Sequence, residues 1–131
     1  HAAFDQVCIY KPAQSRPANS ERYFVCRGMR EGAEAVAERL STLARPWILL
    51  GDFNDTPGTR TRRLLGGLGV EGRGPEGGSN TWPATGPTVD IDTIITGPGE
   101  TWNAFEKRIG IEATASDHRP VVADVPAPRR P

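Results

Sequence analysis

The sequence predicts an α/β domain, and three features support this prediction. A helical pattern covers about residues 30–44, and an apolar strand at residues 47–50 follows directly after Pro46, which is the order of elements in α/β units. A β-branched run at residues 89–95 and an apolar run at residues 121–125 supply further strands. At 131 residues, with 37% hydrophobic and 24% charged side chains, the chain fits one soluble domain with a modest core.

Charge and cysteine content weaken the case for several classes of protein. The formal net charge is +0 and the sequence pI is about 6.9, so there is no global attraction to a polyanion, which argues against nucleic acid as a partner without eliminating it. Cys8 and Cys26 are too few for a disulfide scaffold and lack zinc-type spacing, and we interpret them as two unpaired thiols. No apolar run approaches the ~20 residues that cross a bilayer, and without a signal-like segment the cytoplasm is the default location.

The first part of the chain is weakly patterned and leads to an amphipathic helix. Residues 7–10 are a candidate for a short strand, the prolines and serines of residues 12–20 mark a loop, and residues 23–26 form a further apolar patch that ends at Gly28. From about Arg30, apolar residues recur at three- and four-residue spacing, which is typical of a helix with one buried face that ends before Pro46. The predicted buried residues of this helix are Ala33, Val36, Ala37, Leu40, Leu43 and Ala44.

The centre of the chain combines an apolar strand with a polar end. Residues 47–50 are four consecutive apolar residues, which favours a strand covered on both faces, and Gly51-Asp52-Phe53-Asn54 follows it. A short helix is expected at residues 59–65, and the glycines of residues 66–80 predict a flexible surface loop. A phosphate-cradling role for this loop is not favoured, because it carries neither a GxGxxG pattern after a strand nor a Walker lysine.

The last part of the chain supplies the remaining strands. Alternation along residues 89–95 places Asp92 on the same face as an isoleucine, so its carboxylate needs a specific partner. Residues 101–111 offer a short strand, and residues 121–125 form the last one. The proline-rich tail, residues 126–131, is expected to be disordered.

Five polar residues stand at or within predicted strand ends: Asp52, Asn54, Asp92, Asp117 and His118. Hard cations such as Mg²⁺ take carboxylate and amide oxygens, which Asp117 could provide together with Asp52 or Asn54. A histidine oriented by a carboxylate can take a proton from water, and Asp92 and His118 could form that pair. Asn54 can donate its amide hydrogens to a phosphate oxygen or to the attacking water. Together these groups indicate metal-assisted hydrolysis of a phosphate ester.

Each of these assignments has a structural alternative. An Asp-His pair is more often a surface pair or a helix cap than a catalytic dyad, and Asp52 could equally cap a turn. Asp55 and Asp90 are interpreted as solvated carboxylates, and Trp82 as a packing residue rather than a substrate platform. Arg62 and its basic neighbours form a cluster that a solvated helix face explains equally well.

Four motifs together resemble those of a known family. They are Gly51-Asp52-Phe53-Asn54, Thr81-Trp82, Ile91-Asp92-Thr93-Ile94 and Ser116-Asp117-His118-Arg119-Pro120-Val121. In this order they resemble the C-terminal motifs of the endonuclease/exonuclease/phosphatase superfamily, which has the DNase I-like fold. The resemblance covers about residues 30–125. It implies that residues 1–125 form the C-terminal portion of one such domain, which is part of a four-layer α/β/β/α sandwich with a mixed β-sheet.

The resemblance also implies a Mg²⁺-dependent phosphoesterase, with Mn²⁺ as an alternative cation, and a role for each site residue. Asp52 and Asn54 would position or activate the nucleophilic water and contact phosphate, and they would share the metal site with Asp117. Asp92 would orient His118, which would act as the base or contact the phosphate.

The chain departs from the family pattern in two respects. The third motif usually begins with Arg and has an aromatic residue or His after its Asp, whereas Asp90 and Thr93 stand at these positions. The family domain is about twice this length, and its first half carries an Asn and a metal-binding Glu that have no convincing match here. We therefore expect part of a longer phosphoesterase, in which an N-terminal half or a partner chain covers the exposed face of the sheet.

The substrate class stays open between nucleic acid, a lipid head group and a small phosphoester. The neutral charge favours the last two, because tight, sequence-independent binding of DNA rests on clustered Lys and Arg. The rival hypothesis is a non-catalytic remnant or interaction module that lacks a complete metal site.

Overall fold

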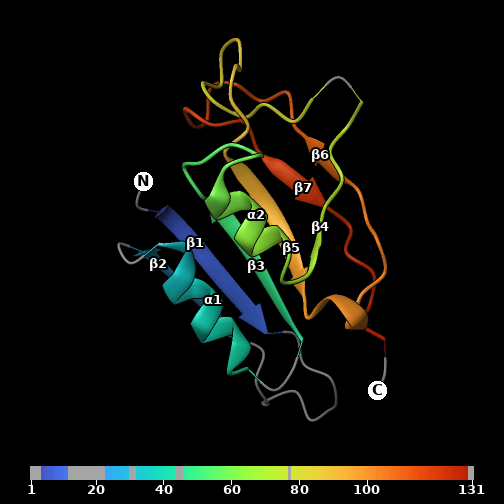
Figure 1. The fold of residues 1–131 in the computed structure, drawn as a ribbon. Helices are drawn as coiled ribbons and strands as arrows, with labels where there is room; N and C mark the ends of the chain where they lie inside the picture. Colours follow the sequence, from blue (N-terminus) through green and yellow to red (C-terminus); the bar gives the residue numbers. More distant parts are fainter. Residues whose placement is uncertain (1–3, 12–22, 30–31, 44–45, 77, 130–131) are drawn as a thin grey trace.

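The computed structural model describes residues 4–11, 23–29, 32–43, 46–76 and 78–129, and it has the predicted α/β composition (Figure 1). The helices and strands are β1 (Phe4–Lys11), β2 (Tyr23–Met29), α1 (Ala33–Ser41), β3 (Trp47–Asp52), α2 (Arg60–Gly66), β4 (Val70–Glu71), β5 (Asp92–Gly97), the 3₁₀ helix η1 (Gly99–Thr101), β6 (Lys107–Ile109) and β7 (Val121–Ala123). Among the described helices, none is long and apolar enough to cross a membrane.

The strands form a five-stranded sheet in the order β2-β1-β3-β5-β4 and a two-stranded sheet of β6 and β7. Every one of these strand pairs is antiparallel, which corrects the prediction of a mixed sheet. Within the described residues the one parallel contact is an isolated bridge between Arg73 and Glu106. The sheet is antiparallel because β1 lies between β2 and β3 and pairs with both of them. These two strands run in the same direction and are joined through α1, but they are not neighbours.

The core lies between the sheet and the two helices, which cover the same face of the sheet in Figure 1. It comprises Ile9, Ala33, Val36, Leu40, Trp47, Leu49, Phe53, Leu65 and Ile95. In β3 the burial alternates, because Trp47 and Leu49 face the helices and are buried while Ile48 and Leu50 point away and are half-buried. The predicted strand is therefore present, but only one of its faces is fully covered.

Both predicted helices are confirmed, with small shifts at their ends. α1 begins at Ala33 after Gly32 and buries the expected face, while predicted residues 30, 31 and 44 lie outside the described part of the chain. α2 begins after Thr59, whose hydroxyl oxygen accepts a hydrogen bond from the backbone N–H of Arg62 at 3.2 Å. This side-chain cap explains why the helix begins at Arg60.

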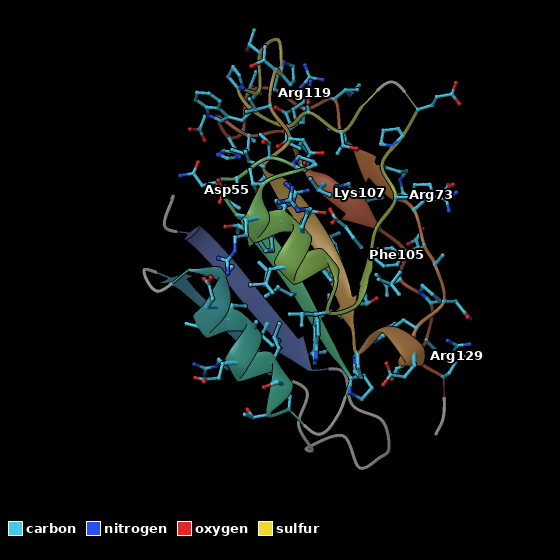
Figure 2. The ribbon with its side chains drawn as sticks, in the orientation of Figure 1. Asp55, Arg73, Phe105, Lys107, Arg119 and Arg129 are labelled. Carbon is cyan, nitrogen blue, oxygen red and sulfur yellow. The ribbon has the colours of Figure 1, made fainter. Side chains whose placement is uncertain are left out.

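The described residues of the glycine-rich segment, 66–76 and 78–80, are more ordered than the prediction of a flexible loop. It contains β4, and Arg73 exchanges backbone hydrogen bonds of 2.9 Å with Phe105 and Lys107, which lie beside it in Figure 2. A Cβ atom at Gly69 would lie only 2.0 Å from the backbone oxygen of Thr96. Glycine is needed here because two backbones approach closely.

The prediction for the cysteines is corrected. Cys8 is disulfide-bonded, and in the register of β1 and β2 it lies opposite Cys26, the other cysteine of the chain, so the interpretation as unpaired thiols is wrong. Disulfides are typical of oxidising compartments rather than of the cytoplasm. In the tail, the backbone N–H of Arg129 donates to the carbonyl of Thr101 at 2.7 Å, and the disorder expected for residues 126–131 stays a prediction.

Candidate active site

The site forms where the end of β3 meets the beginning of β5. Asp52 is the last residue of β3 and Asp92 is the first of β5, and the antiparallel register places them directly opposite one another. His118 comes from the segment that precedes β7. These three residues were all predicted to belong to the site, and the structure brings them together.

The distances within this group are short. Nδ1 of His118 lies 2.8 Å from Oδ2 of Asp92, and Nε2 of His118 lies 3.5 Å from Oδ2 of Asp52. One ligand atom from each residue can be chosen so that all lie within 4.8 Å of one another. The side chains of Asp52, Asp92 and His118 are 14%, 16% and 24% exposed. They are therefore open enough for a ligand to reach them, yet shielded enough to interact strongly.

Thr81 is the second partner of Asp92. Its side-chain hydroxyl donates to Oδ2 of Asp92 at 2.5 Å, and Thr81 itself has no exposed surface. The backbone of Thr81 in turn accepts from the N–H of Arg119 at 2.8 Å, which ties the His118 segment to the Thr81 loop. The prediction that Asp92 needs specific partners is confirmed, and the Thr81-Trp82 motif has a supporting role next to the site.

His118 carries a proton more readily than an ordinary histidine. Burial alone would lower its pKa, but the hydrogen bond to Asp92 and the negative charges of Asp92, Asp52 and Asp117 outweigh this effect. The pKa of His118 is therefore raised above the ordinary value of 6.5.

Asn54 and Asp117 lie at the edge of this group. Asn54 is exposed with a φ of 54°, in the left-handed region, and its backbone N–H donates to Oδ1 of Asp52 at 2.9 Å. Its carboxamide has no hydrogen-bond partner among the described residues. Oδ1 of Asp117 lies 3.9 Å from Nε2 of His118, and its side chain is 81% exposed. The predicted metal set of Asp52, Asn54 and Asp117 stays a prediction, since the compact group in the described part of the chain is Asp52, Asp92 and His118.

The donor chemistry of the compact group fits a divalent cation. Two carboxylates offer the hard oxygen ligands that Mg²⁺ and Mn²⁺ prefer, and the imidazole adds a nitrogen ligand acceptable to Mn²⁺. The carboxylates of Asp52, Asp92 and Asp117 gather around the imidazole, and their negative charge, which also raises the pKa of His118, attracts a cation to this corner of the molecule. The residues present therefore fit a metal site.

A shallow pocket of about 180 Å³ adjoins the site. Its lining includes Asp92, the apolar side chains of Leu50 and Val121, and Arg119. Arg119, labelled in Figure 2, donates through Nε to the carbonyl of Ala84 at 2.7 Å. Trp82 is 41% exposed in the loop beside Thr81, and its interpretation as a packing residue stays a prediction.

Sequence reasoning missed a buried ion cluster next to the site. Asp90, interpreted as a solvated carboxylate, lies 3.3 Å from the guanidinium of Arg62, and the two side chains are 16% and 2% exposed. Arg62 therefore does not belong to a solvated helix face. A signal existed, because Arg62 precedes the buried Leu65 by three residues and so shares its helix face.

Comparison with known proteins adds the following. Residues 3–118 match the model of the Endonuclease/Exonuclease/phosphatase family. The chain is also 51% identical over 45 residues to cap-specific mRNA (nucleoside-2'-O-)-methyltransferase 1 of Xenopus laevis, and 52% identical over 40 residues to that of Mus musculus. These matches cover 34% and 30% of the chain but only 5% of each relative. An inactive 1B form from Caenorhabditis briggsae is 49% identical over 43 residues, with 32% of this chain and 5% of the relative covered. No solved structure matches.

Proposed function

The chain belongs to the endonuclease/exonuclease/phosphatase family, and on this premise we propose that it provides part of a metal-dependent phosphoesterase. The reaction is hydrolysis of a phosphodiester or phosphomonoester bond by an activated water. The observation that carries the proposal is the 2.8 Å contact between His118 and Asp92, with Asp52 on the other side of the imidazole. The short methyltransferase matches, which span about a twentieth of those relatives, do not carry their activity to this chain.

His118 acts on protons through Nε2. Ionised Asp92 accepts the Nδ1–H, which fixes the tautomer and leaves Nε2 free to take a proton from water or to contact the phosphate. Asn54 offers its exposed carboxamide to a phosphate oxygen. In the metal-free protein, the hydrogen bond to Asp92 and the negative charges of Asp92, Asp52 and Asp117 raise the pKa of His118 above 6.5, so its neutral form accumulates only above that pH.

Mg²⁺ or Mn²⁺ is the proposed cofactor. Asp52 and Asp92 would hold it, with Asn54 and Asp117 as further ligands at the open edge of the site. When bound, the cation supplies charge stabilisation for the phosphate oxygens and lowers the pKa of water. Asp92 would then bind the cation and also keep His118 oriented.

The proposed substrate is a small phosphoester or a lipid head group rather than a long nucleic acid. Arg119 is the one basic side chain in the lining of the pocket beside Asp92, and the net charge of the chain is +0. Tight binding to a nucleic acid backbone requires several clustered cations. We also propose that an additional segment or a partner chain covers the sheet face of Ile48 and Leu50, which stays half-buried.

The alternative is a non-catalytic interaction module that keeps the fold. Hydrolysis of bis(p-nitrophenyl) phosphate in the presence of Mg²⁺ separates the two. The proposal predicts that His118→Ala lowers kcat by about 10²- to 10⁴-fold. The control Arg108→Ala, which removes only an exposed ion pair to Asp124, should leave kcat unchanged. Equal activity of the wild-type chain and His118→Ala would reject the assigned base. Absence of Mg²⁺-dependent hydrolysis in this chain and in a longer protein containing it would favour the interaction module.

A further inference from the structure

The ion cluster beside the site contains Arg62, Glu71, Asp90, Thr93 and Lys107. Nη2 of Arg62 lies 2.9 Å from Oε2 of Glu71, and the hydroxyl of Thr93 donates to the same oxygen at 2.8 Å. Nζ of Lys107 donates to the hydroxyl of Thr93 at 2.8 Å. Both cationic side chains are 2% exposed. Asp90 and Thr93, the two positions that depart from the family pattern, both belong to this cluster.

Arg62 joins two backbone segments of the active site. Its Nη1 donates to the carbonyl of Asp55 at 2.8 Å and to the carbonyl of Asp90 at 3.1 Å. The first carbonyl follows directly on Asn54, and the second lies two residues before Asp92. Figure 2 shows Asp55 beside α2, the helix that carries Arg62. One guanidinium therefore bridges the turn after β3 and the segment before β5.

Stability alone does not account for this arrangement. Nε of Arg62 is buried without a hydrogen-bond partner in the described part of the chain, which is unfavourable. Buried ion pairs are in general poor stabilisers compared with apolar packing, because both charges lose their hydration. What the cluster provides instead is a fixed geometry, since its hydrogen bonds are directional.

We propose that Arg62 is a positioning residue that holds the Asn54 turn against the strand segment carrying Asp92. Asn54 is in the left-handed region, which asparagine adopts more readily than other non-glycine residues and which marks a tight turn here. Its N–H is held by Oδ1 of Asp52, and the carbonyl of the next residue, Asp55, is held by Arg62. The catalytic significance of this positioning rests on the proposed function. The geometric effect does not depend on it.

Arginine is required because its planar fork reaches several acceptors at once. The guanidinium contacts the carbonyls of Asp55 and Asp90 and the carboxylates of Asp90 and Glu71. Lysine keeps the charge but cannot reach these acceptors together from one nitrogen. The metal-binding group should survive the loss, because the pairing of β3 with β5 holds Asp52 opposite Asp92 independently of Arg62.

Native-state hydrogen exchange by NMR tests the proposal without any need for activity. In Arg62→Lys the backbone N–H of Asn54 should exchange about tenfold faster than in the wild type, while the N–H of Phe53, which donates to Ile91 in the sheet, stays protected. The matched control is Lys107→Met, which perturbs an equally buried cation of the same cluster that contacts neither turn carbonyl. Unchanged exchange at Asn54 in Arg62→Lys, or an equal increase in Lys107→Met, would overturn the proposal.

A milder variant covers the case in which Arg62→Lys does not fold. Asp90→Asn weakens only the longest contacts of Arg62, at 3.3 and 3.4 Å, and leaves both carbonyl contacts in place. It should raise the exchange of the Asn54 N–H in the same direction by a smaller factor. Unchanged exchange in this variant, when Arg62→Lys does not fold, would count against the proposal.

A double-mutant cycle then tests the catalytic part. If Arg62 acts through Asn54, Arg62→Lys lowers kcat about tenfold in the wild-type background and has no further effect in the Asn54→Ala background. Additive losses in kcat would overturn the catalytic role. An inactive wild-type chain would instead reject the proposed function, and the exchange measurement would still decide the positioning role.

Discussion

The hydrogen bond from Thr81 to Asp92 should be one of the strongest single polar contacts in the domain. Thr81 has no exposed surface, and its hydroxyl donates to a carboxylate at 2.5 Å. Thr81→Val keeps the shape of the side chain and removes only this donor. Hydrogen bonds to charged groups contribute about 1.5–3 kcal/mol, whereas neutral ones contribute about 0.5–1.5 kcal/mol.

Thr96 offers a matched control for this substitution. It also has no exposed surface, but its hydroxyl donates to the neutral carbonyl of Val70 at 3.3 Å. At about 4 °C per kcal/mol for a domain of this size, Thr81→Val should lower Tm by about 6–12 °C and Thr96→Val by about 2–6 °C. Differential scanning calorimetry measures both.

A functional consequence should accompany the loss of stability. Without the Thr81 hydroxyl, His118 is the remaining contact of Oδ2 of Asp92 among those described. We therefore expect kcat to fall about 10- to 100-fold, which is the usual loss when a hydrogen-bond partner of a metal-binding residue is removed. Thr96→Val should leave kcat unchanged. Equal losses of Tm in the two variants would refute the idea that Thr81 supports a buried carboxylate.

Three further predictions concern the metal, the histidine and the core. Mn²⁺ at about 100 times its Kd should stabilise the wild-type chain by about 2.7 kcal/mol in thermal unfolding, and Asp52→Asn should remove most of this gain; a full gain in the variant would contradict the assigned ligand. In metal-free protein, the stability that His118 draws from its carboxylate partners should be present in full below pH 6.5 and lost as the pH rises through its raised folded-state pKa. Urea unfolding of the wild type and His118→Gln across pH 5–9 measures this, and a difference independent of pH would rule it out. Gly97→Ala should destabilise the fold by about 1–3 kcal/mol or more, because the new Cβ would lie 2.0 Å from Cζ2 of buried Trp47, and an unchanged urea midpoint would show that the core adapts.

Features set by local patterns could be predicted from the sequence. The three- and four-residue spacing of apolar side chains predicts α1, and Thr59 followed by the glycines after Leu65 predicts α2. The apolar run at residues 47–50 predicts β3, and the polar residues that follow it predict that Asp52 lies at the end of this strand, where the structure has it. The proximity of Asp52, Asp92 and His118 could be predicted because each of these residues belongs to a motif at the end of a predicted strand.

Features set by long-range contacts could not be predicted in this way. The disulfide of Cys8 depends on the register between β1 and β2, which the spacing of the cysteines does not encode. The predicted strand at residues 89–95 is shifted to Asp92–Gly97 because Val89 pairs with Trp82 instead of extending the sheet. The antiparallel sheet order likewise depends on β1 lying between β2 and β3.

The charge pairing inside the ion cluster could not be predicted from the sequence either. Nothing near Arg62 in the sequence reveals that Asp90, which is 28 residues away, will neutralise it in the interior. A basic residue on the same face as Leu65 was a local clue, but the identity of its partners was not. Charges in a folded protein are therefore assigned reliably only after the strands have been placed.

We propose above that Asp92 and His118 act as a pair in the hydrolysis of phosphate esters. The most direct measurement is the Mg²⁺-dependent hydrolysis of bis(p-nitrophenyl) phosphate by Asp92→Asn, compared with the wild type at saturating substrate. In this variant kcat should fall by about 10²- to 10⁴-fold while the fold is retained, because the imidazole loses its orienting carboxylate. Wild-type kcat in a folded Asp92→Asn variant would contradict the proposal.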